Sequence, residues 1–282
     1  MLSRTVRTNG DSAAGRSTCV TEFGDETLYV GTSGWQYRHW RDTFYPPDVP
    51  ASRWLEHFAE RFGTVEVNNT FYRLPKASTF RTWAERTPDD FVVAVKMSRY
   101  LTHVKRLKDP EEPVSRFLER ARCLGPKLGP VLLQLPPNLE ANHDALARTL
   151  GLLTPTVRTA VEFRHDSWFD DTTPRILSDH GAAQCLADSL SRRSPVWRTA
   201  DLTYVRFHEG EDTPHPCYRS EQLKGWAHLL RERWGPDATC YAYFNNDGRA
   251  CALRDAVMLA GFAGAEGLAP SRVPDGSDIR VA

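Results

Sequence analysis

Charged side chains that could do chemistry alternate with apolar residues in three short segments, Val65–Asn69, Val161–His165 and Tyr204–His208. This alternation is typical of a buried strand whose polar face continues past its end. Buried strands do not tolerate unpaired charge, so ionisable groups at the same end of several strands indicate a shared site.

Two glutamates and a histidine in these segments are the candidate catalytic residues. Glu66 or Glu162 would act as general base or general acid, because a carboxyl group inside a protein can have its pKa tuned toward neutrality. His208 would be the partner in proton transfer. These residue types therefore point to acid–base catalysis.

The elements that must position these residues alternate between strands and helices. Helical spacing of apolar residues separates eight strand-like runs, and in about 240 residues this order favours a closed (β/α)8 TIM barrel of the α/β class over an open doubly wound sheet. The absence of a glycine-rich phosphate loop after the first run also weighs against a nucleotide-binding open sheet. The predicted strands are Leu28–Thr32, Thr64–Asn68, Phe91–Lys96, Pro130–Leu135, Thr159–Arg164, Ala183–Asp188, Thr203–His208 and Thr239–Asn245. The helical spacing lies within 54–62, 114–121, 146–153 and 223–234.

Side-chain alternation predicts which residues face the barrel axis. Apolar residues of a barrel strand pack outward on helices, so their polar neighbours face inward and meet at the carboxyl ends of the strands. The eighth strand is ambiguous, because either Tyr241 and Tyr243 or Ala242 and Phe244 could face inward. The predicted inward set is Glu66, Asn68, Lys96, Gln134, Glu162, Arg164, Asp188, Arg206 and His208, with Asn245 and Asn246 following on the same rim.

The composition is that of a globular protein without a net positive charge that would attract anions to the whole molecule. Of 282 residues 40% are hydrophobic, no apolar run is long enough to cross a bilayer, and 36 basic residues balance 36 acidic ones. Six cysteines without a C-x-x-C pair predict reduced thiols in a cytoplasmic protein. One barrel domain is expected at 27–265, between a disordered tail at 1–26 and a flexible one at 266–282.

A series of motifs in order resembles the DUF72 family of YecE-like proteins. The resemblance implies a TIM barrel whose biochemical function is not established, and it covers about 28–262. Two departures concern loop geometry: Glu209 stands where the family usually has Gly, and Asp255 stands where Asn is common. The motifs are Gly31–Trp35, Val65–Pro75, Thr102–His103 with Arg106–Leu107, Gln134–Pro137, Glu162–Trp168, Tyr204–His208 and Tyr243–Asn246.

Three cations on the predicted inner face, Lys96, Arg164 and Arg206, favour an anionic ligand. A phosphate or carboxylate held by such a cluster in a low-dielectric mouth is bound firmly. The leading hypothesis is an enzyme that acts on an anionic, phosphate-bearing small molecule or nucleotide, with no cofactor. Beyond the inward set, the candidate ligand-binding residues are the aromatic side chains Trp35, Tyr72 and Trp168 and the loop residues His103, Arg106 and His165.

Three alternatives stay open at this point. The charges could neutralise one another in a network without chemistry. Glu66, Glu162, Asp188 and His208 could hold a divalent metal for phosphodiester hydrolysis or isomerisation, although the interleaved cations would repel it and no compact ligand motif is present, so no metal is expected. A non-catalytic binder of nucleic-acid ends or phosphorylated ligands is the third.

Overall fold

The computed structural model describes residues 26–279, and the predicted amino-terminal tail lies outside this range apart from Glu26. Eight strands form a closed parallel barrel: the order is β5-β4-β3-β2-β1-β9-β8-β6, and β5 pairs with β6 to complete the ring. A two-residue strand, β7 (Arg192–Arg193), pairs antiparallel with the end of β6. The barrel strands are β1 (Leu28–Thr32), β2 (Thr64–Val67), β3 (Val92–Lys96), β4 (Leu128–Gln134), β5 (Thr159–Glu162), β6 (Ala183–Ser189), β8 (Leu202–Phe207) and β9 (Thr239–Phe244). The predicted TIM barrel is confirmed.

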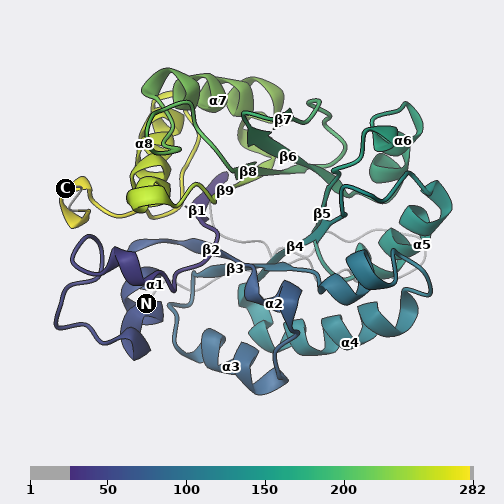
Figure 1. The fold of residues 1–282 in the computed structure, drawn as a ribbon, viewed down its shortest axis with the longest axis horizontal. Coiled ribbons are helices and arrows are strands. Elements are labelled where there is room, and N and C mark those ends of the chain that lie inside the picture. Colours follow the sequence, from purple (N-terminus) through teal and green to yellow (C-terminus); the bar gives the residue numbers. More distant parts are fainter. Residues whose placement is uncertain (1–25, 280–282) are drawn as a thin grey trace, which may run out of the picture.

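Helices surround the barrel on its outer face (Figure 1). They are α1 (Trp54–Arg61), α2 (Asn69–Tyr72), α3 (Ala77–Glu85), α4 (Glu111–Ala121), α5 (His143–Leu153), α6 (Thr172–Asp179), α7 (Ser220–Arg233) and α8 (Cys251–Ala265). The predicted helical segments correspond to α1, α4, α5 and α7. Sequence spacing did not predict α2, α3, α6 and α8. The first three are nine residues long or shorter and offer few positions for a helical repeat, and α8 is apolar at most of its positions, so no polar face marks it. In the described part of the chain, no helix combines the length and apolar character needed to span a bilayer.

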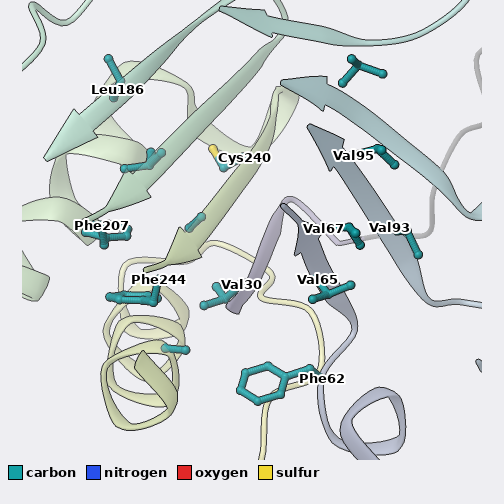
Figure 2. Close-up of a cluster of buried hydrophobic side chains, with 14 of the residues drawn as sticks. Val30, Phe62, Val65, Val67, Val93, Val95, Leu186, Phe207, Cys240 and Phe244 are labelled. Carbon is teal, nitrogen blue, oxygen red and sulfur yellow. The ribbon is translucent and has the colours of Figure 1, made fainter. Parts of the chain in front are cut away.

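Apolar side chains form two separate layers on either side of the strands. The outer layer packs against the helices, and Figure 2 shows part of it, including Val65, Phe207 and Phe244. The inner layer fills the barrel near the amino ends of the strands with tyrosine rings, and it includes Tyr241, whose ring stacks on Tyr29 with centroids 5.2 Å apart. Tyr243 is also in the inner layer, which settles the ambiguity of the eighth strand.

The segment after α8 is packed against the barrel and differs from the flexible tail expected at 266–282. Pro270 forms a parallel bridge with Leu28, and the backbone N–H of Val30 donates to Ser271 Oγ at 3.1 Å. Arg272 pairs with Asp90 at 2.8 Å. A run rich in Pro, Gly and Ser therefore acts here as a strap across the amino ends of β1 and β3.

Cys217 and Cys251 form a disulfide, which corrects the expectation of reduced thiols for this pair. The chain folds back after β8 so that the two Cα atoms lie 5.0 Å apart, within the usual range for a disulfide, although 34 residues separate them in sequence. The bond joins the loop after β8 to the first residue of α8. Cys123, Cys185 and Cys240 are free thiols.

Reduction of this disulfide should lower the free energy of unfolding by about 4 kcal/mol, because a cross-link of this loop length restricts the unfolded chain. Urea unfolding with and without dithiothreitol measures the difference. The double variant Cys217→Ala/Cys251→Ala should be insensitive to the reductant, and Cys123→Ala should respond as the native chain does. Equal stability of the native chain under both conditions would contradict this expectation.

Candidate functional site

The centre of the barrel mouth is a buried ion cluster around Arg206. Arg206, near the end of β8, is only 2% exposed, and its guanidinium reaches two carboxylates on other strands. Nη1 donates to Glu162 Oε2 at 2.7 Å and Nη2 donates to Glu66 Oε2 at 3.0 Å, while Nε lies 2.9 Å from Glu66 Oε1. β2, β5 and β8 are thus joined through their inward side chains, as alternation along the strands predicted.

Glu66 accepts further hydrogen bonds from three neutral donors. The hydroxyl of Tyr204 donates at 2.8 Å, the amide of Asn68 at 2.9 Å and the hydroxyl of Ser33 at 2.5 Å. With Arg206 these donors occupy both carboxylate oxygens. Glu66 is therefore a fully bonded anion that orients the guanidinium.

Glu162 links the buried cluster to the mouth. Its Oε1 accepts from Arg164 Nε at 2.7 Å, and the Arg164 side chain is 28% exposed, so that this guanidinium faces partly toward solvent. Gln134 stands beside Glu162 in the register of β4 and β5 and is 4% exposed. The predicted inward positions of Gln134, Glu162 and Arg164 are confirmed by this arrangement.

Both carboxyl groups are more acidic than usual, contrary to the expectation of a pKa near neutrality. Burial alone would raise the pKa of Glu66, but Arg206 and Lys96 outweigh it and lower the pKa. Burial would likewise raise the pKa of Glu162, yet Arg206 and Arg164 hold that pKa well below its usual range. Both groups are ionised at neutral pH and poorly suited to take up a proton.

His208 lies two residues after Arg206, and its side chain is a neutral imidazole. Burial, aided by the nearby Arg206, lowers the pKa of His208 to about 4. Nδ1 lies 2.9 Å from Asn245 Nδ2, whose N–H₂ donates to it, and this places the ring proton on Nε2. Nε2 is buried and has no hydrogen-bond partner among the described residues. His208 therefore offers a buried N–H that no residue of the described chain accepts.

Lys96, at the end of β3, lies in an aromatic setting. Its Nζ is 4.4 Å from the centroid of the Phe71 ring, and the residue is 8% exposed. Burial, together with Arg206, lowers the pKa of Lys96 to about 8. The ring of His103 meets the same Phe71 ring edge-on at 4.8 Å, so Lys96 and His103 are brought together from a strand and the following loop.

A sequence model described as "Protein of unknown function DUF72" matches residues 29–277, which is nearly the whole barrel and the strap after it. The chain belongs to the DUF72 family.

Relatives of this DUF72 protein include YecE of Escherichia coli O157:H7, 31% identical over 168 residues, which cover 57% of this chain and 59% of YecE. YunF of Bacillus subtilis is 25% identical over 253 residues, covering 78% of this chain and 89% of YunF. Among solved structures, a DUF72 family protein from Thermotoga maritima is similar with a TM-score of 0.72 and 29% identity, covering 84% of this chain and 99% of that one. One from Enterococcus faecalis, 16% identical, has a TM-score of 0.69.

Two residues predicted for the site face away from it. Asp188 lies opposite Phe207 in the register and points outward, where it accepts from Trp226 Nε1 of α7 at 3.0 Å. The inward positions of β6 are Cys185 and Ala187, so the predicted direction of Asp188 is wrong. Asn246 donates to Asp255 at 2.7 Å and is 1% exposed, so it braces α8 rather than the mouth.

Several predicted ligand contacts are packing or capping residues. Trp168 is fully buried and donates to the carbonyl of Leu139 at 2.8 Å, and Trp35 is 5% exposed and packs edge-on against Trp83. His165 accepts from the backbone N–H of Ser167, which caps a short turn.

Two further predicted residues lie in the loops. Arg106 donates to the carbonyl of Asn138 at 2.6 Å and so holds the loop after β3 to the loop after β4. Tyr72 is 72% exposed at the end of α2, next to Phe71.

Sequence reasoning missed two donors to Glu66. Tyr204 has the same inward parity as Arg206, two residues away, and this signal was available. Ser33 follows β1 directly, and no charge marked it. An aromatic residue in a strand is typical of the core, whereas Tyr204 is both a core residue and a hydrogen-bond donor.

The acidic residues of the mouth are not arranged as metal ligands. Across residues 26–279 no group of three or more His, Cys, Asp or Glu side chains is placed to hold a metal ion. Arg206 occupies oxygens of both Glu66 and Glu162, and Asp188 faces α7. The four-residue metal set considered from the sequence is therefore not brought together.

Replacing Arg206 by Met should destabilise the protein by about 3–5 kcal/mol, because two buried carboxylates lose their counter-charge. The matched control is Arg116→Met on α4, which removes an exposed ion pair with Glu112 and should cost under about 1 kcal/mol. Urea unfolding at neutral pH measures both. Similar losses for the two variants would show that the cluster is not a coupled buried network.

Acidification should reveal the depressed pKa of His208. The unfolded residue takes up a proton near pH 6.5 and the folded one only near 4, so the stability contributed by His208 is complete above pH 6.5 and lost as pH falls toward 4. The loss is about 3 kcal/mol. Unfolding free energies at pH 7 and pH 4 should therefore differ less in His208→Asn than in the native chain. The control, His228→Asn at an exposed position of α7, should keep the native pH dependence; an unchanged dependence in His208→Asn would refute the assignment.

Proposed function

We propose that this DUF72 protein is an enzyme that acts on an anionic, phosphate-bearing small molecule or nucleotide at the carboxyl end of its barrel. The observation that carries the proposal is the net positive charge of the side chains at the mouth. Glu66 and Glu162 are offset by Arg206 and Arg164, whereas the Lys96 ammonium has no carboxylate in salt-bridge contact within the described chain. The mouth therefore carries a surplus positive charge although the whole chain is neutral.

Cations from three places gather on one side of this mouth. Burial lowers the pKa of His103, and the positive charges of Lys96, Arg99 and Arg164 lower it further. Arg99 is exposed in the loop after β3 and Arg164 is partly exposed, so both guanidinium groups are accessible to a ligand. Arginine is suited to bidentate contact with phosphate oxygens.

The residues divide into positioning and proton-transfer roles. The sequence predicts Glu66 or Glu162 as general base or general acid. In this proposal they instead orient Arg206 and Arg164, because both carboxylates are ionised and hydrogen-bonded. His208 is the proton-transfer residue in this proposal, because its Nε2 has no other partner among the described residues.

Ligand binding should require Arg164. In a thermal-shift screen of phosphorylated sugars, nucleotides and short oligonucleotides, a true ligand at one hundred times its Kd stabilises by about 2.7 kcal/mol. Calorimetric titration of such a ligand into Arg164→Gln should give an affinity at least about tenfold weaker, the loss of one charge-assisted hydrogen bond. Arg148→Gln, which disrupts only an exposed pair with Glu111 on the outside of the barrel, should bind as the native chain does.

The same screen separates the alternatives. An enzyme should convert the ligand, and His208→Asn should abolish conversion while affinity is kept; a binder would show no conversion in either protein. Nucleic-acid binding would weaken steeply with added salt because each phosphate contact releases counterions. Failure of every phosphate-bearing compound to bind would overturn the proposal.

A further inference from the structure

The chain contains two buried lysines, and they differ in their surroundings. Lys127 lies just before β4 and is 7% exposed. Its Nζ donates to the carbonyls of Ala84 and Thr87 at 2.5 and 2.6 Å, so this amine is engaged in structural hydrogen bonds. Lys96 is 8% exposed, and its Nζ contacts a phenyl ring. Among residues 26–279, no hydrogen-bond acceptor is placed on the Lys96 amine.

The position of Lys96 disfavours a purely structural ion pair. The two carboxylates nearest in the barrel, Glu66 and Glu162, have their oxygens turned to arginine. A lysine retained for charge balance would contact one of them. Lys96 instead ends β3 at the level of the ion cluster, with Leu132 of β4 beside it in register. An amine in an apolar setting beside guanidinium cations is the known arrangement that turns lysine into a nucleophile.

We propose that the Lys96 amine is a nucleophile that forms an imine with the carbonyl carbon of an aldehyde or ketone carrying a phosphate or carboxylate group. This inference rests on the proposed function, because it names the substrate class of the same site. The anionic group would lie against Arg164 and Arg99, which leaves the carbonyl end of a short molecule for Lys96. The pKa of Lys96, lowered to about 8 by burial, supports this role because about a tenth of the amine is unprotonated at pH 7, far more than for an ordinary lysine.

The covalent step balances without any redox partner. The neutral Lys96 nitrogen attacks the carbonyl carbon, the C=O π electrons move to oxygen, and transfer of a proton from nitrogen to oxygen gives a carbinolamine. Protonation of the hydroxyl group releases it as water and leaves a C=N bond to Lys96. His103 packs edge-on against the Phe71 ring that Lys96 Nζ also contacts, and its imidazole, whose pKa is lowered by burial and nearby cations, is the proposed carrier of the proton from nitrogen to oxygen.

Reductive trapping tests the proposal. The full chain is incubated with sodium cyanoborohydride and one of three short aldehydes: glycolaldehyde phosphate, glyoxylate or uncharged glycolaldehyde. Peptide mass mapping then locates and quantifies the secondary amine formed. Glycolaldehyde phosphate and glyoxylate distinguish a phosphate from a carboxylate requirement, and glycolaldehyde is the matched control without the anion. Calorimetric titration with inorganic phosphate, without reductant, measures anion binding separately.

We expect the adduct on Lys96 to exceed that on exposed Lys76 and Lys108 by at least about tenfold with an anionic aldehyde, since an amine of lower pKa is less protonated at neutral pH. Glycolaldehyde should label Lys96 at least about tenfold less than its phosphate does. Lys127 should stay unlabelled, because its amine is hydrogen-bonded. Lys96→Arg, which keeps a cation at the end of β3, should lose the preferred adduct while its circular dichroism and melting temperature stay near native values.

The possible failures are distinguishable. Phosphate binding without preferred labelling of Lys96 overturns the imine and leaves the proposed function standing. Labelling spread evenly over exposed lysines likewise overturns the imine. Absence of both phosphate binding and preferred labelling overturns the imine and the proposed anionic substrate together.

Discussion

The contact of one buried guanidinium with two carboxylates determines the character of this barrel mouth. Arg206 bridges β8 to β2 and β5, strands on different sides of the ring, and each of the three charges is almost fully removed from water. A buried ion is tolerated only where its partners and hydrogen bonds replace hydration. The donors around Glu66 supply those bonds, so Ser33, Asn68 and Tyr204 are constrained by the same requirement. The cluster thereby fixes side chains from four strands or strand ends.

This neutralisation has a consequence for the groups at the edge of the cluster. Because arginine takes up the carboxylate charge, Lys96 and His208 experience mainly desolvation and neighbouring cations, and the pKa of each falls. The groups whose pKa is shifted toward neutrality or below it are therefore basic ones, and the carboxylates serve as ionised hydrogen-bond acceptors. At this mouth the acids thus serve as supports for the basic groups.

Much of this arrangement could be predicted from the sequence, and the reasons for the exceptions are physical. Alternation with strongly apolar neighbours sets the direction of Glu66, Glu162 and Arg206, so their meeting was foreseeable from parity alone. The direction of Asp188 was not predicted correctly because the outward positions of β6 are Gln184, Leu186 and Asp188, two of them polar, whereas small apolar residues face inward, the reverse of the rule that holds for the other strands. The disulfide and the strap over 268–279 depend on how loops return to the barrel, and no local pattern encodes this.

The layer of stacked tyrosines beneath the ion cluster fills the barrel interior, so that only the mouth at the carboxyl ends of the strands is open. Tyr29, Tyr204, Tyr241 and Tyr243 are at most 2% exposed and fill the interior where the strands begin. A molecule held above them must leave by the rim through which it came.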